Sequence, residues 1–300
     1  MPVSAPRLGK SLRASHLRIA AMSEQVQFEE RPTAKRLILS VLSQPNMACL
    51  PIRQLIAWGA LFDQKPSAIR VTVGRLVAEE LLVKTGRGMY TIGPGGLALK
   101  NKAGEWATAL TRICDWEGGW FGVYTAHLGK AYRRKVRARE RAFRLLGFKE
   151  LVSGLWVRPD NLHYTASQMY KKLCEFGLDA EAVVMRSQTL LQLSSKNPLT
   201  LWSSNGLNAG YEQATKLLRY SQQRLEHQDL HTVTRESFIV GEHVIRQINA
   251  DPLLPGEHID AARRDDMVKA MRRYSDFCHP YWAKFLGLPD AGPISSNGER

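Results

Sequence analysis

The residue types best suited to chemistry lie between Lys65 and Arg87, where arginines alternate with small side chains. The stretch "PSAIRVTVGRLVA" has helical spacing, and a helical wheel separates its residues into two faces. The face turned away from the predicted core is small and polar. It carries Ser67, Val71, Gly74, Arg75 and Ala78, with Ala68 and Arg70 on its flanks. Small residues let a backbone approach a surface closely, and a guanidinium binds guanine edges or phosphates. This face therefore suits contact with a nucleic acid.

Two further residues sharpen this expectation. Gly74 costs about 1 kcal/mol relative to alanine in the middle of a helix, so either DNA or a neighbouring helix must come close to it. The strand-like runs "LLVKT" and "MYTI" then flank "GRG", which predicts a tight hairpin with Arg87 at its tip. The predicted DNA-contact set is Lys65, Ser67, Ala68, Arg70, Val71, Arg75 and Arg87.

Three helices must position these residues. We expect the first within 31–44, the second from Pro51 to about Trp58 with a stop at Gly59, and the third from an N-cap at Ser67 to about Leu82. The core-facing residues of the third helix are predicted to be Ile69, Val73, Leu76, Val77 and Leu81. Three short helices followed by a hairpin form a winged helix-turn-helix pattern.

The charge distribution agrees with polyanion binding by the N-terminal two thirds of the chain. The net charge is +14, and residues 1–110 hold 15 Lys and Arg against 7 Asp and Glu. Residues 111–190 hold 14 against 8, whereas residues 191–300 hold 13 against 13. An excess confined to the first two thirds favours a nucleic-acid-binding module joined to a part with another task.

The middle of the chain alternates strand-like and helical segments. The predicted strands are "WFGVYTA", "LVSGLWV" and "AEAVVMRSQTLL", and a helix near 130–147 carries eight basic residues and one acid. These basic residues are expected all around that helix, either as a solvated surface or as a phosphate-binding one. Beyond residue 200 the spacing is helical, with the segment "DPLLPGEH" separating the last two helices.

These patterns predict a mostly helical α+β protein with three domains. The first is a winged helix at 31–100, the second an α/β sandwich at 111–195, and the third a helical domain at 200–288. Residues 1–30 are expected to form a disordered basic leader, with Met22 as a plausible start, and 289–300 a disordered tail.

Several segments resemble known regulators. "PSAIRVTVGRLVAEELL" is similar to the recognition helix of GntR-type winged-helix regulators. "WEGGW" (116–120), "LLGFKELVSGLWVRPDNL" (145–162) and "DPLLP" (251–255) resemble segments of the PaaX family in the expected order. The resemblance covers about residues 31–288. It implies a ferredoxin-like central domain and a dimeric repressor of phenylacetate catabolism, which binds an inverted repeat and is released by phenylacetyl-CoA.

The resemblance implies an effector, and aromatic and basic residues of the middle region form its expected site. Its expected residues are Trp116, Trp120, Arg134, Trp156 and Arg158. The tryptophans would either line the bottom of an aromatic pocket or pack in the core. The "YTAHLG" ending of the first central strand departs from the family pattern, so another aromatic acid or its CoA thioester is as suitable an effector. Repressor and activator also both stay open.

The alternatives are an RNA-binding or nuclease-related protein that uses the basic central helix, and an acyl-CoA enzyme. The nuclease reading lacks a carboxylate at the end of the first central strand, within "YTAHLG". No catalytic or phosphate-loop motif is found, and His227 and His231 lack the glutamate of a zinc-protease motif. We therefore expect no enzyme activity, no metal and no cofactor.

The remaining sequence features indicate the cellular compartment in which the protein is expected. No stretch has the roughly 18 apolar residues of a membrane span, and residues 1–21 lack the apolar centre of a signal peptide. The four cysteines form no CxxC pair, which suits buried thiols in a reducing cytoplasm. A cytoplasmic homodimer without membrane contact is expected.

Overall fold

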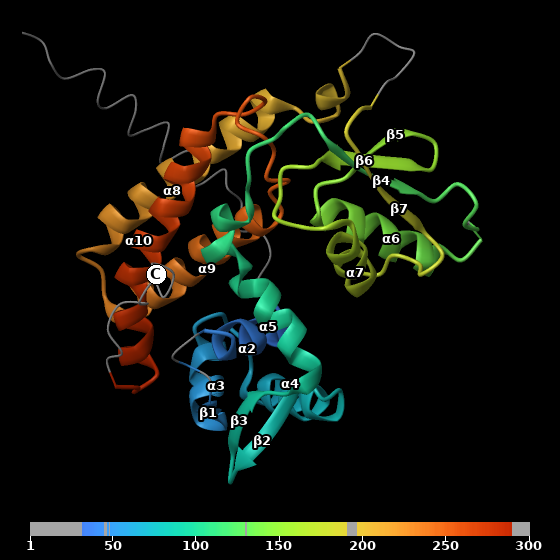
Figure 1. Ribbon diagram of the computed structural model, residues 1–300. Coiled ribbons are helices and arrows are strands. Elements are labelled where there is room, and N and C mark those ends of the chain that lie inside the picture. The colour runs from blue at the N-terminus through green and yellow to red at the C-terminus, as the bar shows by residue number, and fades with distance from the viewer. Residues whose placement is uncertain (1–31, 45–46, 48, 130, 191–196, 290–300) are drawn as a thin grey trace, which may run out of the picture. The chain divides into compact units, whose positions relative to one another are not determined.

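A computed structural model describes residues 32–44, 47, 49–129, 131–190 and 197–289, and they form a mostly helical α+β protein with two small sheets (Figure 1). The predicted leader, most of the tail and Lys130 lie outside these residues. The chain divides into two compact units. The first contains residues up to Gly95 with 216–240 and 276–300, and the second contains 96–215 with 241–275. The long C-terminal helices thus contribute to both units.

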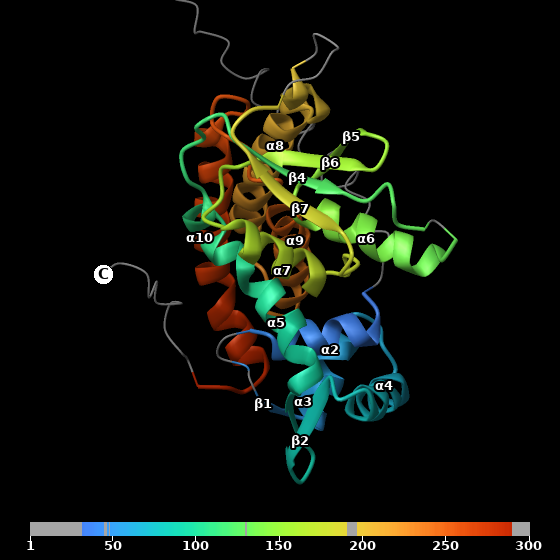
Figure 2. The same cartoon turned by 45° about the vertical axis from the view of Figure 1, so that its right-hand side comes forward.

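The first unit begins with the three short helices that the sequence predicts. They are α2 (Ala34–Leu42), α3 (Ile52–Ala60) and α4 (Pro66–Ala78), and β1 (Cys49–Pro51) lies between the first two. β2 (Leu82–Gly86) and β3 (Met89–Ile92) form the hairpin, and the antiparallel sheet has the order β1-β3-β2. Figure 2 shows this hairpin extending beyond α3 and α4.

Helix α3 is longer than predicted, and Gly59 lies inside it instead of ending it. A Cβ at this position would lie 2.6 Å from Cδ1 of Ile69 on α4. The glycine therefore allows α3 and α4 to pack closely, which a pattern of caps cannot reveal. Strand β1 was not predicted, because three residues give too short a pattern to recognise.

Helix α4 begins and ends earlier than predicted. Its N-cap is Lys65 with Pro66 in the first turn, so Ser67 is already helical. It ends at Ala78, because Glu80 adopts a left-handed φ of 55° and the Leu81 amide then donates to the Leu76 carbonyl at 2.9 Å. Ile69, Val73 and Leu76 are buried as predicted. Val77 and Leu81 are only half-buried, which corrects their assignment to the core.

Aromatic side chains join α3 to the C-terminal helices within the first unit. The Trp58 ring lies 5.3 Å from Phe238 of α9 (Leu230–Asn249) and 5.8 Å from Trp282 of α10 (Ala261–Phe285), measured between ring centroids. Trp282 also donates from Nε1 to Oγ of Ser237 at 2.7 Å. The ends of α9 and α10 thus complete the core beneath the three short helices.

The second unit contains a four-stranded antiparallel sheet. Its strands are β4 (Trp120–Tyr124), β5 (Lys149–Val152), β6 (Leu155–Pro159) and β7 (Val183–Ser187), in the order β5-β6-β4-β7. The segment "LVSGLWV", predicted as one strand, is a hairpin, since Gly154 turns the chain with a φ of 79°. Helices α6 (Arg133–Leu145) and α7 (Ala166–Glu175) cover one face (Figure 1), where Phe121 and Val123 pack against Phe143 and Leu173.

Further helices complete this unit. Helix α5 (Leu97–Gly104) follows the hairpin, where a linker was expected, and α8 (Ser204–Leu225) opens the C-terminal part. Short 3-10 turns lie at Pro94–Gly96, Glu105–Thr108, Leu110–Arg112 and Pro198–Leu201. Cys278 is buried, whereas Cys49 is exposed and Cys114 and Cys174 are half-buried, so the expectation of four buried thiols is wrong for three of them. In the described part of the chain, no helix is long and apolar enough to cross a membrane.

Candidate nucleic-acid interface

Helix α4 presents the face that the sequence assigned to nucleic-acid contact. Ser67, Arg70, Gly74, Arg75 and Ala78 are exposed, and Ala68 is half-buried on the flank. Val71 is the most exposed apolar side chain of this helix, with 73% of its surface accessible. Isolated apolar groups of this kind suit contact with a thymine methyl, whereas they gain nothing in water.

The environment of Gly74 distinguishes the two explanations for a glycine at this position, which are close approach of DNA and close packing of a neighbouring helix. A Cβ built on Gly74 would meet no heavy atom within 4 Å. Packing of a neighbouring helix therefore does not account for this glycine, in contrast to Gly59. The open space lies between Arg70 and Arg75, so the helix backbone is accessible where the two guanidiniums are available.

The two arginines differ in their surroundings. Arg75 keeps 60% of its side chain exposed and has Glu79 one turn away, with an Nε–Oε1 distance of 3.7 Å. Glu79 also accepts from Nζ of Lys35 on α2 at 3.1 Å. Because this carboxylate is shared and itself exposed, it holds Arg75 only weakly. The guanidinium can therefore turn toward a phosphate or a base.

The hairpin holds Arg87 at its tip, as the sequence predicts. Gly88 adopts a φ of 72°, whereas Gly86 stays in β2 and pairs with Met89 across a register shift. The Gly88 carbonyl accepts from the Ile52 amide at 2.8 Å, which ties the turn to the start of α3. Arg87 itself is exposed, and Lys65 is exposed at the start of α4.

One basic residue beside this hairpin, Arg53, is not predicted from the sequence pattern. Arg53 in the first turn of α3 is exposed, and it lines a shallow groove of about 530 Å³ together with Arg87, Cys49 and Met89. The groove exists because β1 pairs with β3 and brings the start of α3 next to the hairpin. A pattern search for helices and hairpins alone does not place Arg53 there.

The residues predicted to bind an effector do not form one site. Trp116 and Trp120 pack edge to face with centroids 5.6 Å apart, but Trp156 stacks on Phe143 at 4.4 Å. Trp156 pairs with Val123, whose side chain faces the helices, so Trp120 lies on the other face of the sheet. Arg134 is exposed on α6. The expected aromatic floor of three tryptophans is therefore not formed.

Arg158 has structural partners instead of a ligand-binding position. It is 1% exposed, and its guanidinium donates to Oδ1 of Asn161 at 3.1 Å and to the carbonyls of Leu146, Pro159 and Pro252. Burial lowers the pKa of Arg158 to about 10, so it stays charged at neutral pH. The Asn161 amide donates to the Leu253 carbonyl at 2.7 Å. Arg158 and Asn161 thus hold the "DPLLP" segment by its backbone.

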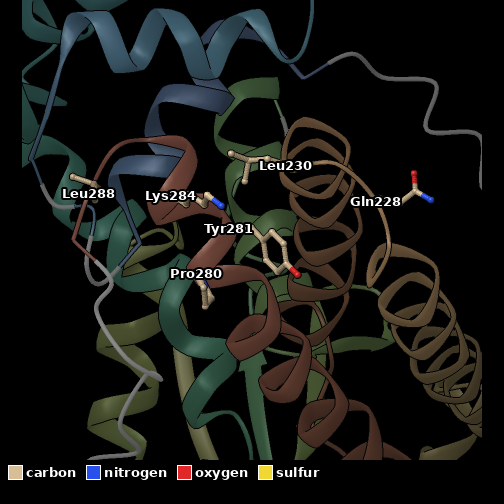
Figure 3. A pocket seen from close by; sticks show the side chains of 6 residues that line it. All are labelled: Gln228, Leu230, Pro280, Tyr281, Lys284 and Leu288. Atoms are coloured by element: carbon tan, nitrogen blue, oxygen red, sulfur yellow. The ribbon is translucent and has the colours of Figure 1, made fainter.

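A groove in the first unit has dimensions suitable for a small ligand. Its volume is about 490 Å³, and it is lined by Gln228, Leu230, Pro280, Tyr281, Lys284 and Leu288. Figure 3 shows Tyr281 and Lys284 of α10 next to Leu230, with Gln228 and Leu288 at opposite ends. An ammonium, a phenol and an amide around apolar side chains suit an amphipathic anion.

The end of β4 lacks the carboxylate that a related nuclease would need. Tyr124 is followed by Thr125, which is buried, and by Ala126 and His127. The His127 ring lies 5.5 Å from the Tyr124 ring and hydrogen-bonds through Nε2 to the Glu181 carbonyl at 2.8 Å. Among the described residues, no three His, Cys, Asp or Glu side chains are grouped to hold a metal.

Comparison with known proteins gives a likeness to a solved structure. No protein-family model matches this chain, and no curated protein sequence is similar to it. A solved structure, the uncharacterized protein Rv0674 from Mycobacterium tuberculosis, is similar with 23% sequence identity and a TM-score of 0.52. The match covers 82% of this chain and 98% of that one, so the two proteins share a fold along most of their length.

Proposed function

We propose that this protein is a transcription regulator that binds duplex DNA sequence-specifically through an N-terminal winged helix. The order α2-β1-α3-α4-β2-β3 with a three-stranded antiparallel sheet supports this assignment. In it, α4 is the recognition helix and the β2–β3 hairpin is the wing. The observation that carries the proposal is the open face of α4, where the Gly74 backbone lies accessible between Arg70 and Arg75.

The contacts follow from the chemistry of each exposed group. Arg70 and Arg75 bind guanine edges or phosphates, and Val71 lies against a thymine methyl in the major groove. Arg87 reaches the minor groove or a phosphate from the wing, and Lys65 neutralises the backbone at the helix start. Ser67 and Ala68 keep the approach unobstructed.

Dimerisation is supported by an exposed apolar row across the central sheet, which has the strand order of a ferredoxin-like domain. Pairing aligns Val152 with Leu155, Leu155 with Tyr124, and Tyr124 with Val183. Tyr124, Val152 and Val183 are 42%, 51% and 49% exposed. A second copy would remove this surface from water, and a two-fold dimer would read an inverted repeat.

The resemblance to the PaaX family extends the proposal to regulation. The protein would repress an operon for the catabolism of an aromatic compound and be released by an aromatic acid or its CoA thioester. The groove at Tyr281 and Lys284 supports an acid of this kind better than the separated tryptophans do. Its volume lies in the range of about 300–1,000 Å³ that is typical of small-molecule sites.

Selection from a random duplex library, followed by binding titrations on the enriched sequence, tests the proposal. We expect Arg70→Ala to weaken binding to that sequence by about 5- to 150-fold, equivalent to about 1–3 kcal/mol. Arg219→Ala, which removes an exposed arginine of α8, is the matched control and should leave binding unchanged. Failure of the wild-type protein to enrich any duplex sequence would falsify the proposal.

The alternative of an RNA-binding protein rests on the basic helix α6. It predicts that binding favours single strands and survives loss of the wing. Arg87→Ala in the same titrations, with a single-stranded RNA of random sequence as competitor, separates the two functions. Preference for the single strand together with no effect of Arg70→Ala would favour the alternative.

A further inference from the structure

Helix α6 carries an arginine stripe, a set of side chains that share one side of the helix. At about 100° per residue, five arginines fall within an arc of about 100°. These residues, which define the arginine stripe, are Arg133, Arg134, Arg137, Arg141 and Arg144, and all are exposed. Lys135 and Arg139 lie on other sides of the helix and Lys130 lies outside the described residues, so the sequence-based expectation of basic residues all around the helix is corrected for these five alone.

The remaining basic residues of α6 in the described chain, Lys135 and Arg139, lie near Asp179 and outside the arginine stripe. Arg139 is buried and donates from Nε to Oδ2 of Asp179 at 2.9 Å, and Lys135 lies 3.7 Å from Oδ1 of the same carboxylate. Asp179 thus pairs with both cations, of which Arg139 is buried and Lys135 is largely exposed. Separation of Lys135 and Arg139 from the other five leaves these five guanidiniums together on one exposed side, next to the exposed Glu140.

The arginine stripe has little internal compensation. Glu140 is the one acidic residue of α6, and no ion pair within 4.0 Å joins it to an arginine of the stripe among the described residues. Arg141 donates to the Phe176 carbonyl at 3.3 Å. For Arg133, Arg134, Arg137 and Arg144, no hydrogen bond or ion pair to another described residue is found. Four uncompensated guanidiniums favour an anionic partner.

The length of the stripe indicates what kind of anion it fits. From Arg133 to Arg144 the helix rises by about 17 Å. A single phosphate or carboxylate would engage one or two of these side chains, whereas duplex DNA carries one negative charge per about 1.7 Å of its axis. An extended row of guanidiniums therefore matches a polyanionic backbone better than a compact ligand.

The side chains of α6 also favour a duplex over a single strand. Proteins that bind single strands place successive aromatic rings beneath the bases. Phe143, the aromatic residue within α6, is buried beneath the sheet, and Tyr132 is a single exposed ring before the helix. Phosphate contacts made by arginine position a protein on nucleic acid without reading its sequence.

We propose that the arginine stripe of α6 binds the phosphodiester backbone of duplex DNA, as a second, sequence-independent contact surface separate from α4. This inference rests on the proposed function, because it takes its partner from the DNA that the winged helix binds. The stripe would raise affinity for all duplexes and leave sequence preference to α4.

The test measures binding of a random-sequence 40-base-pair duplex by fluorescence anisotropy between 50 and 200 mM KCl. The variant combines Arg133→Gln, Arg137→Gln and Arg144→Gln, which keep helix propensity. Each lost phosphate contact lowers the slope of log affinity against log salt by about 0.9, so we expect a decrease of up to about 2.7. The loss should be equal for the random duplex and for a selected sequence.

A charge-matched control removes three other exposed cations, with Arg235→Gln, Lys269→Gln and Arg273→Gln on α9 and α10. Both variants lose three positive charges, so only the position of the charge differs. Thermal unfolding of each variant checks that the fold is retained. If the stripe variant and the control keep the wild-type slope, or lose it equally, the inference is wrong.

The outcomes separate this inference from the proposed function. If Arg70→Ala abolishes sequence preference while the stripe variant binds DNA like the wild type, only the stripe inference fails. If the stripe variant loses binding to a single-stranded RNA of random sequence but not to the duplex, the stripe is an RNA surface and the inference is overturned. If the wild-type protein binds no duplex at 50 mM KCl, both proposals fail.

Discussion

Arg139 of α6 and Asp179 form an ion pair that is largely buried, with 2.9 Å between Nε and Oδ2 and each side chain 8% exposed. The pair fixes which side of α6 faces the core. It also connects the helix to the segment that leads into β7. The arginines on the opposite side are exposed as a direct consequence.

The first prediction concerns the stability of this pair. Asp179→Asn leaves the buried guanidinium of Arg139 without its counter-charge, and we expect a loss of about 3 kcal/mol in the free energy of unfolding. Urea unfolding followed by circular dichroism measures it. Lys135→Ala should cost less than about 1 kcal/mol, because the Lys135 side chain is 67% exposed. Equal stability of Asp179→Asn and wild type would show that the pair does not hold α6.

The second prediction separates stability from DNA contact at Gly74. Gly74→Gln removes a helix-interior glycine in open space, so the free energy of unfolding should rise by about 0.5–1 kcal/mol. The longer side chain should at the same time obstruct the approach of DNA and weaken binding to the selected duplex at least tenfold. Unfolding curves and anisotropy titrations measure both effects. A stabilised variant with unchanged DNA affinity would remove α4 from the interface.

The third prediction concerns the pH dependence of Glu105. Its carboxylate accepts from Lys102 at 2.7 Å and lies 3.3 Å from both Arg112 and Lys172. Burial raises the pKa of Glu105, but the three cations outweigh burial and leave the pKa below its usual value of 4.5. The contribution to stability is therefore complete above about pH 4.5 and is lost as the pH falls through the lowered pKa.

Glu105→Gln tests this dependence. At pH 7 the variant should be less stable by about 1 kcal/mol, and the difference should shrink as the pH falls toward 3. Urea unfolding of both proteins in steps between pH 7 and pH 3 measures it. A constant difference across the whole range would contradict the assignment.

The fourth prediction concerns the groove beside α10. Lys284→Gln removes the ammonium that would pair with a carboxylate, so binding of phenylacetate or benzoate should weaken about 10- to 100-fold. Calorimetric titration of the free protein measures it. Arg134→Gln is the control from the site expected on sequence grounds. Weakening by the control and not by Lys284→Gln would place the effector outside the groove.

Much of the first unit follows from local sequence. The apolar spacing of Ile69, Val73 and Leu76 determines which side of α4 is buried, and helix geometry then places Arg70 and Arg75 outside. The hairpin follows similarly, because Gly88 allows the positive φ of its turn. These features depend on residues within a few positions of each other, so a period and a turn suffice to predict them.

Other features depend on partners distant in the sequence. Gly59 and Gly74 are both glycines within helices and look alike in the sequence. The space where a Cβ would lie is occupied by Ile69 at Gly59, whereas it is open at Gly74. Arg139 and Arg137 look alike on a basic helix, yet only Arg139 meets Asp179, forty residues away. Trp120 and Trp156 lie on opposite faces of one sheet because of its register. The sequence alone determined which residues could bind an anion; tertiary packing decided which of them remain available, since burial and pairing depend on what each side chain meets.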